Sequence, residues 1–177
     1  DLTDRVQAVK EGDTLSLGHC TLQFIAAPSV HWPEVMMSYV PEEQVLFSAD
    51  GFGKFGVYDA GADDWACEAR RYYFNICGKY GVQVAKALGK VAALSGVKAI
   101  CPLHGPVLKD EAMQEALRLY NIWAHYEVET PGVFIAYASA HGGTAAAAEQ
   151  MRDLLLERGC PKVATADLCR TAMAENA

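Results

Sequence analysis

Apolar residues recur along the chain in two patterns, which predict an alternation of strands and helices. Short runs rich in β-branched and aromatic residues indicate strands. The expected strands of the first part are 14–17, 21–26, 44–48 and 97–101. Apolar residues at helical spacing predict a long helical region over 63–94 and an amphipathic helix over 109–126. Asp63 is a candidate N-cap of the first region, and Gly78 and Gly81 are expected to divide it.

The pattern changes after a Glu-Thr-Pro-Gly loop. An apolar run over 133–138, which we expect to be a buried strand, precedes a helix over 145–158 and a strand over 163–165. This order is a β-α-β unit, in which the two strands are parallel. We therefore predict an α/β protein, with α+β character in its first domain (residues 1–130) and a second domain over residues 131–177.

Composition and charge argue against several classes of partner. The net charge is −7 at pH 7, whereas nucleic-acid binding requires clustered Lys and Arg. No apolar run approaches the roughly 20 residues of a membrane-spanning helix, and the first residues lack the cationic flank of a signal peptide. The six cysteines form no CxxC pair, which favours buried free thiols in a reducing compartment. We expect a cytoplasmic protein without nucleic-acid or membrane partners.

Three residues with metal-binding side chains follow predicted strands: His31, Asp50 and His104. Side chains at the ends of neighbouring strands can converge on one edge of a sheet, and imidazole and carboxylate groups suit iron, zinc or manganese. A carboxylate has two oxygens and can bridge two metals about 3.5 to 4 Å apart. The residues alone are compatible with a metal site and with ordinary surface or hydrogen-bonded histidines.

The loop between the first strand and the helix of the second domain combines hydroxyl groups with glycines. Unpaired N–H groups and the dipole at a helix N-terminus attract anions, and glycine lets the backbone approach a phosphate closely. The candidate phosphate-binding residues are Ser139, Ala140, His141, Gly142, Gly143 and Thr144. An ordinary β-α turn with Thr144 as helix N-cap fits the pattern equally well.

Three motifs resemble the later metal-ligand motifs of flavodiiron proteins, also called A-type flavoproteins, and occur in the family's order. They are Val30-His31-Trp32-Pro33-Glu34, Leu46-Phe47-Ser48-Ala49-Asp50-Gly51-Phe52-Gly53 and Pro102-Leu103-His104-Gly105-Pro106. The resemblance covers about residues 15–168. It implies the C-terminal half of a metallo-β-lactamase-like αββα domain, followed by the first β-α-β of a flavodoxin-like doubly wound fold.

By this resemblance, His31 binds one iron, Asp50 bridges two iron ions and His104 binds the other. The family's remaining ligands belong to an upstream H-x-E-x-D-H motif, which nothing in residues 1–30 matches, so the chain resembles an internal fragment. The loop over 139–144 is similar to the FMN 5′-phosphate loop, in which Asn usually stands at the position of Gly143. A segment over 68–81 is also similar to the family, and we interpret it as packing.

The function implied is that of an oxidoreductase with FMN and a binuclear iron site. Electrons from a partner such as rubredoxin, a flavin reductase or a deazaflavin would pass through FMN and reduce dioxygen to water or nitric oxide to nitrous oxide. The family also implies a head-to-tail homodimer. His19 and His125 match no ligand motif, and we expect them to lie in solvent or on a helix face.

Two other hypotheses compete with this one. The first is a metal-dependent hydrolase of the metallo-β-lactamase fold without redox activity, which the downstream phosphate loop argues against because a hydrolase needs no flavin domain. The second is an inactive truncated chain that binds neither iron nor FMN, which the missing upstream ligands support. Iron content and flavin absorbance distinguish the three hypotheses.

Overall fold

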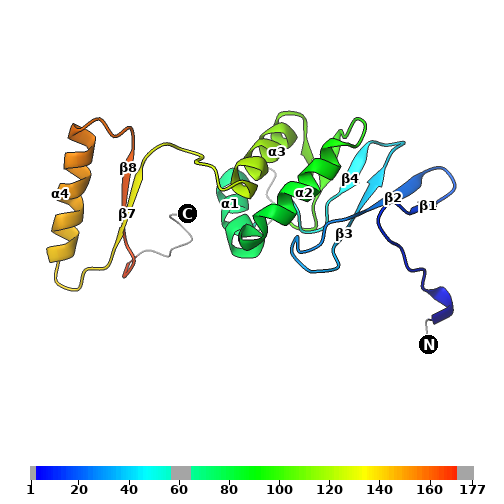
Figure 1. The fold of residues 1–177 in the computed structure, drawn as a ribbon, viewed down its shortest axis with the longest axis horizontal. Helices are drawn as coiled ribbons and strands as arrows, with labels where there is room; N and C mark the ends of the chain where they lie inside the picture. The colour runs from blue at the N-terminus through cyan, green and yellow to red at the C-terminus, as the bar shows by residue number, and fades with distance from the viewer. Residues whose placement is uncertain (1–2, 57–64, 171–177) are drawn as a thin grey trace. The chain divides into compact units, whose positions relative to one another are not determined.

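The computed structural model describes residues 3–56 and 65–170 of the 177-residue chain (Figure 1). The chain divides into two compact units, Asp1–Glu127 and Val128–Ala177. This division lies close to the boundary that the sequence predicts after residue 130. The predicted N-cap Asp63 lies outside the described residues.

The first unit is built on a six-stranded sheet with the strand order β1-β2-β3-β4-β5-β6. β4 and β5 pair in parallel, and the other neighbouring strands are antiparallel. The strands are β1 (Thr14–Ser16), β2 (Thr21–Ala26), β3 (Met36–Val40), β4 (Val45–Phe47), β5 (Ala99–Cys101) and β6 (Leu108–Lys109), and a short 3-10 helix, η1 (Thr3–Arg5), precedes them. The sequence pattern predicts four of these strands and misses β3 and β6.

Helices cover one face of this sheet. They are α1 (Trp65–Ile76), the 3-10 helix η2 (Gly78–Tyr80), α2 (Gly81–Ala92) and α3 (Asp110–Ala124). Buried residues mark the helix-covered face of the sheet. Ile25 of β2 pairs with Met37 of β3, and both side chains are buried. Further along the sheet, Leu46 pairs with Ile100 on the same face. On the opposite face, Phe47 is 47% exposed. Helices on one face of a sheet are half of an αββα sandwich, as the resemblance implies.

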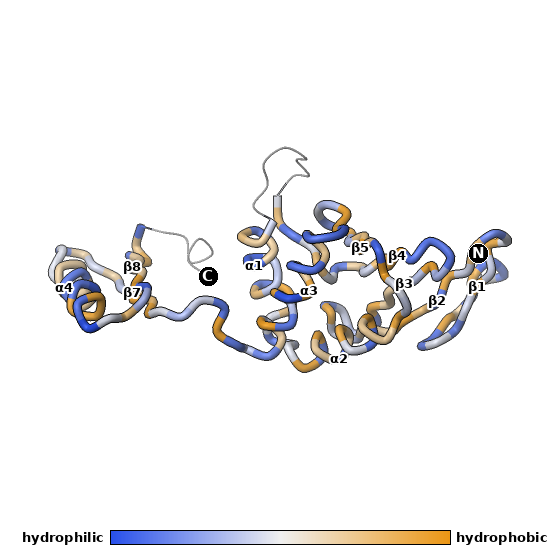
Figure 2. The backbone as a smooth tube through the Cα atoms, turned by 90° about the horizontal axis from the view of Figure 1, so that it is seen from above, coloured by the Kyte–Doolittle hydropathy of each residue, from blue (hydrophilic) through white to orange (hydrophobic). Residues whose placement is uncertain are grey.

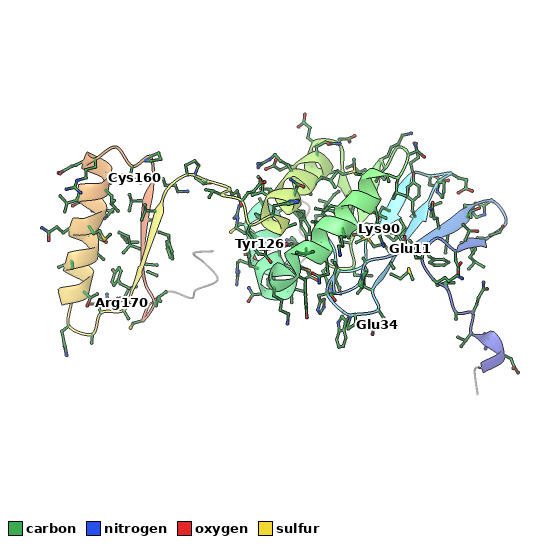
Figure 3. The ribbon with its side chains drawn as sticks, viewed as in Figure 1. Glu11, Glu34, Lys90, Tyr126, Cys160 and Arg170 are labelled. Carbon is green, nitrogen blue, oxygen red and sulfur yellow. The ribbon has the colours of Figure 1, made fainter. Side chains whose placement is uncertain are left out.

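The predicted division of the long helical region at Gly78 and Gly81 is confirmed. A Cβ atom at Gly81 would lie 2.6 Å from the carbonyl oxygen of Ala124, so no other residue fits this close approach without movement. The Tyr126 hydroxyl, labelled in Figure 3, donates to the Gly78 carbonyl at 3.0 Å and accepts from the Gly81 N–H at 3.3 Å. The end of α3 therefore holds the junction between α1 and α2.

An ion pair closes the end of β2 that leads into the His31 loop. The Oε2 atom of Glu11 accepts from the Ala26 N–H at 2.7 Å, and the Lys90 ammonium donates to the Ala26 carbonyl at 2.7 Å. Lys90 and Glu11 also pair with each other at 2.7 Å (Figure 3). The hydrogen bond from Lys90 is the main cause that lowers the pKa of the Glu11 carboxyl.

We expect Glu11→Gln to destabilise the protein at pH 7 and low salt by about 1 kcal/mol or less, since both side chains are more than one-third exposed. The pKa of Glu11 is lower in the folded than in the unfolded state. The pair therefore stabilises the fold above the unfolded-state pKa, and this contribution is lost as the pH falls through the folded-state pKa. Urea unfolding of both proteins at a series of pH values from 7 down to 2 measures it. A difference that does not diminish as the pH falls would contradict the electrostatic origin.

The second unit is a β-α-β unit, as predicted. Its elements are β7 (Val133–Tyr137), α4 (Gly143–Glu157) and β8 (Val163–Asp167), and the two strands are parallel. The Thr165 hydroxyl donates to Glu149 at 3.0 Å and so connects β8 to α4. The expectation of a buried first strand is wrong, because Val133 is 37% and Phe134 is 48% exposed. In the described residues, one helix packs against this two-stranded sheet and cannot cover both of its faces.

Cysteine burial differs from the sequence expectation. None of the six cysteines is in a disulfide, as expected, but only Cys77 is buried. Hydrophilic and hydrophobic segments alternate along the chain (Figure 2), as amphipathic elements require. In residues 3–56 and 65–170, no helix has both the length and the apolar character needed to cross a bilayer.

Candidate metal centre

His31, Asp50 and His104 follow β2, β4 and β5, and these three strands run in the same direction. β4 and β5 are parallel. β2 and β4 are each antiparallel to β3, which lies between them, so they are parallel to each other in direction. The C-terminal ends of all three strands therefore meet at one edge of the sheet. The structure brings the three residues together, as the sequence predicts.

Asp50 lies between the two histidines. The Nε2 atom of His31 is 3.3 Å from Oδ2 of Asp50, and the Nε2 atom of His104 is 3.3 Å from Oδ1 of Asp50. The side chain of Asp50 is 14% exposed, whereas those of His31 and His104 are 31% and 57% exposed. Each carboxylate oxygen thus faces a different imidazole, and the site opens to its surroundings on the histidine side.

These distances fit metal coordination. Two ligands bound to one metal at about 2.1 Å, at an angle near 90°, hold their donor atoms roughly 3 Å apart. In residues 3–56 and 65–170, no group of three or more His, Cys, Asp or Glu side chains could hold a metal ion by itself. The arrangement instead consists of two histidine–carboxylate pairs that share Asp50. This geometry is compatible with two metal positions bridged by a carboxylate and with two histidine–carboxylate hydrogen bonds.

Backbone hydrogen bonds join the loops that carry Asp50 and His104. The Leu103 N–H donates to the Ala49 carbonyl at 2.8 Å, and the Lys54 N–H donates to the His104 carbonyl at 3.2 Å. Lys54 is 4% exposed, and its aliphatic stem passes close to Gly105, where a Cβ atom would lie 2.8 Å from its Cγ atom. The two loops therefore form one packed layer.

The Asp50 loop contains backbone conformations that are unfavourable for residues with side chains. Ala49 and Phe52 have φ angles of 52° and 66°, in the left-handed region. The buried Ser48 hydroxyl donates to the Gly51 carbonyl at 2.7 Å and stabilises the turn. The Phe52 ring packs on the ring of Tyr120 with a centroid distance of 4.4 Å. Local strain concentrated beside a candidate ligand is typical of functional sites.

Sequence reasoning missed Tyr72, which it interpreted as packing. This residue of α1 is 5% exposed, and its hydroxyl lies close enough to Asp50 to respond to the charge of the carboxylate. Burial first, and then the negative charge of Asp50, raise the pKa of the Tyr72 hydroxyl well above its ordinary value, so the hydroxyl stays protonated beside the carboxylate. No sequence signal distinguishes Tyr72 from the neighbouring core tyrosine Tyr73, because both occupy the buried stripe of one helix.

Cys77 lies close enough to Asp50 to respond to its charge. Burial and the Asp50 carboxylate raise the pKa of the Cys77 thiol to about 12. A metal-binding cysteine needs a thiolate, so the neutral Cys77 thiol is part of the packing behind the site. His19 is exposed, and His125 is an exposed residue whose ring nitrogen lies 2.8 Å from the Asn121 carbonyl oxygen. Neither belongs to the candidate centre.

We expect Tyr72→Phe to weaken metal binding by roughly 10- to 100-fold, the usual effect of removing a polar group that supports a ligand from behind. The ring, and hence the packing, stays in place. Tyr73→Phe is the matched control, because the buried Tyr73 hydroxyl has no hydrogen-bond partner among the described residues. Iron titration against a competing chelator measures both variants. Equal affinities of the two variants would exclude a role for Tyr72 in positioning Asp50.

The second unit presents the candidate phosphate loop at the start of α4. Gly142 has a φ angle of 84°, and Cβ atoms added at Gly142 or Gly143 would meet nothing within 4 Å. The Ser139 hydroxyl accepts from the Ala145 N–H at 3.2 Å. The helix begins at Gly143 with Gly142 as its N-cap, so the expectation of Thr144 as N-cap is wrong, while the choice between a phosphate loop and an ordinary β-α turn stays open. The first turn of α4 therefore borders open space on its N-terminal side.

Comparisons with known proteins agree on one group of relatives. No model of a protein family matches the chain. The nitric oxide reductase of Moorella thermoacetica is 33% identical over 159 residues, covering 86% of this chain and 39% of that protein. The rubredoxin-oxygen oxidoreductase of Megalodesulfovibrio gigas is 32% identical over 163 residues, covering 88% of this chain and 40% of that protein. The crystal structure of the flavodiiron protein from Giardia intestinalis matches with a TM-score of 0.86 and 28% identity, over 96% of this chain and 42% of that chain. This chain spans about two fifths of the length of these relatives.

Proposed function

The chain belongs to the flavodiiron proteins, and on that premise we propose that it is part of an oxidoreductase that uses FMN and two iron ions to reduce dioxygen to water or nitric oxide to nitrous oxide. The relatives named for nitric oxide reduction and for oxygen reduction with rubredoxin support both substrates. The reaction needs a pair of neighbouring metals that can hold a diatomic molecule between them.

The observation that carries the proposal is the contact of each Asp50 oxygen with a different histidine, at 3.3 Å in both cases. His31 and His104 would each hold one iron, and Asp50 would bridge the two irons. The Tyr72 hydroxyl lies near Asp50 and burial keeps it protonated, so it would donate to the carboxylate and orient it. When bound, the irons and FMN supply the redox chemistry. The chain's own residues hold the irons and orient the bridging carboxylate.

For the second unit, we propose that residues 139–144 bind the 5′-phosphate of FMN. The N–H groups of the first helical turn have no acceptor within the helix and point toward its N-terminal side. The open space around Gly142 and Gly143 leaves room for a phosphate there. The Thr144 hydroxyl lies in the same exposed turn and can donate a further hydrogen bond.

We also propose an electron-donating partner, such as rubredoxin or a flavin reductase, and a head-to-tail homodimer in which the flavin of one subunit serves the irons of the other. The free cysteines favour a cytoplasmic location, where thiols stay reduced. Size-exclusion chromatography with light scattering tests the homodimer, and fractionation of cells tests the location.

The proposed function is tested on the longest natural open reading frame that contains this sequence, purified without air. We expect iron and FMN to copurify, and reduced protein to consume dioxygen or nitric oxide. Metal without flavin, together with esterase or lactamase activity, would favour the hydrolase hypothesis. Absence of both cofactors would favour the inactive chain.

We expect Gly143→Asp to weaken FMN binding by about tenfold or more, because it places a carboxylate beside the phosphate. Gln150→Asp is the matched control, since it adds the same charge to an exposed position further along α4. Fluorescence quenching of FMN measures both affinities. Equal losses in the two variants would indicate a general charge effect and contradict phosphate binding at residues 139–144.

A further inference from the structure

The surface of the first unit contains an apolar cleft between α2 and α3, which lie side by side (Figure 1). Its volume is about 460 Å³. Leu88 and Val91 of α2, with Leu94 just after this helix, form one wall, and Met113 and Leu117 of α3 form the other. The amide side chains of Gln114 and Asn121 also line the cleft, but most of its lining residues are apolar, which suits an apolar ligand.

A second, much smaller void lies beneath this cleft. Its volume is about 10 Å³, and it shares two lining residues with the cleft, Leu88 and Val91. Its other lining residues include Val30 and Gly51. Val30 directly precedes His31, and Gly51 directly follows Asp50. Leu88 and Val91 therefore border both the open cleft and the void that reaches the backbone of the metal centre.

The apolar lining of this void disfavours water relative to a small apolar gas. A void of about 10 Å³ is at the limit for one water molecule, which would also need two or more polar partners that an apolar wall does not provide. A small apolar gas loses no hydrogen bonds when it enters such a region. Leu88 and Met37 both line the void, and side chains in packed interiors do change rotamers.

Gly89 keeps the mouth of the cleft open. It lies within α2, where glycine is less favourable than alanine, yet a Cβ atom at this position would meet nothing within 4 Å. Packing therefore does not require glycine at this position. The missing side chain leaves space in the cleft that a larger residue would occupy.

We propose that the cleft between α2 and α3, together with the void beneath Leu88 and Val91, is an apolar gas-binding route to the candidate metal centre. The route serves a small diatomic gas, which deepens the proposed function and rests on it for the identity of the substrate. The experiment is performed on the longest natural open reading frame. It combines xenon binding, which requires no iron or flavin, with the kinetics of gas reduction.

We expect xenon under pressure to occupy the cleft in crystals and to give a saturable ¹²⁹Xe shift in solution. A Cβ atom at Gly89 meets nothing within 4 Å, so Gly89→Leu should place its side chain in the mouth of the cleft and abolish that site, whereas Gly89→Ala should retain it. In the same Gly89→Leu variant, kcat/KM for the gas should fall on the order of tenfold with kcat at saturating gas unchanged, as expected when only access is impaired. Leu117→Trp, which fills the cleft from α3, provides a second test if Gly89→Leu does not fold.

Absence of xenon from the cleft, or an unchanged kcat/KM in both filled variants, would overturn the proposed route. Failure of the proposed function is recognised separately, as absence of gas consumption by the wild-type protein. In that case, the xenon measurement alone tests the proposed gas site. Binding that is lost in Gly89→Leu and kept in Gly89→Ala would support an apolar gas site, and no binding would overturn it.

Discussion

Replacement of Asp50 by alanine is expected to abolish stable iron binding, with a loss well beyond the 10- to 100-fold that follows from removal of a group behind a ligand. The substitution removes both oxygens that face the histidines at 3.3 Å. His31 and His104 would then each lack the partner they share, and two cations close together would lose the negative charge between them. The measurement is the iron content per chain after anaerobic purification and gel filtration.

Asp50→Asn separates charge from geometry and serves as the companion variant. It keeps one carbonyl oxygen and the size of the side chain, so an intermediate loss of iron is expected. Thermal unfolding of the metal-free proteins provides the control for folding. If wild-type protein and Asp50→Ala contain equal amounts of iron, the three residues form a hydrogen-bonded cluster and no metal site.

Trp123→Ala is expected to destabilise the first unit by about 3 to 5 kcal/mol, the range for removal of a buried large aromatic side chain. Trp123 is 2% exposed, and its ring lies 5.3 Å from the ring of Tyr73 and 5.4 Å from that of Tyr120. These aromatic residues connect α3 with α1. Tyr120 also packs on Phe52 of the Asp50 loop, so the cavity would loosen the support of the metal centre.

Urea or thermal unfolding measures this effect, and a fall in Tm of more than about 10 °C is expected. Val82→Ala is the matched control, because Val82 of α2 is 60% exposed and its truncation should change stability by about 0.5 kcal/mol or less. If the two substitutions lower the stability by similar amounts, the aromatic cluster does not make the expected contribution to the stability of the core.

Local sequence pattern predicts most elements of the fold because it reports which residues can face a core. The strand over 21–26 is confirmed as β2, and the helix over 109–126 is confirmed as α3 with bounds Asp110–Ala124. β3 was missed because its Met-Met-Ser-Tyr-Val sequence carries few β-branched residues, although Met37 and Tyr39 alternate correctly as buried residues. β6 has only two residues, too few to form a periodic pattern.

The exposed β7 shows a different limit of local pattern. Val133 and Phe134 are apolar and were expected to be buried, but burial depends on which other elements cover the sheet. Sequence reports the preference of a side chain for an apolar environment. The presence of a partner surface is a property of the assembled fold.

The sequence by itself determined the order of most elements and the three candidate ligands, because a polar ligand-type residue directly after an apolar strand is a local feature. Only the tertiary structure decided that β2, β4 and β5 end at the same edge and that each Asp50 oxygen faces a different histidine. It also decided that Tyr72 lies near Asp50 and that Leu88 and Val91 line both the surface cleft and the void beside Val30 and Gly51. The physical reason is that these contacts join residues far apart in the chain, and their geometry follows from strand direction and helix packing, which no local period encodes.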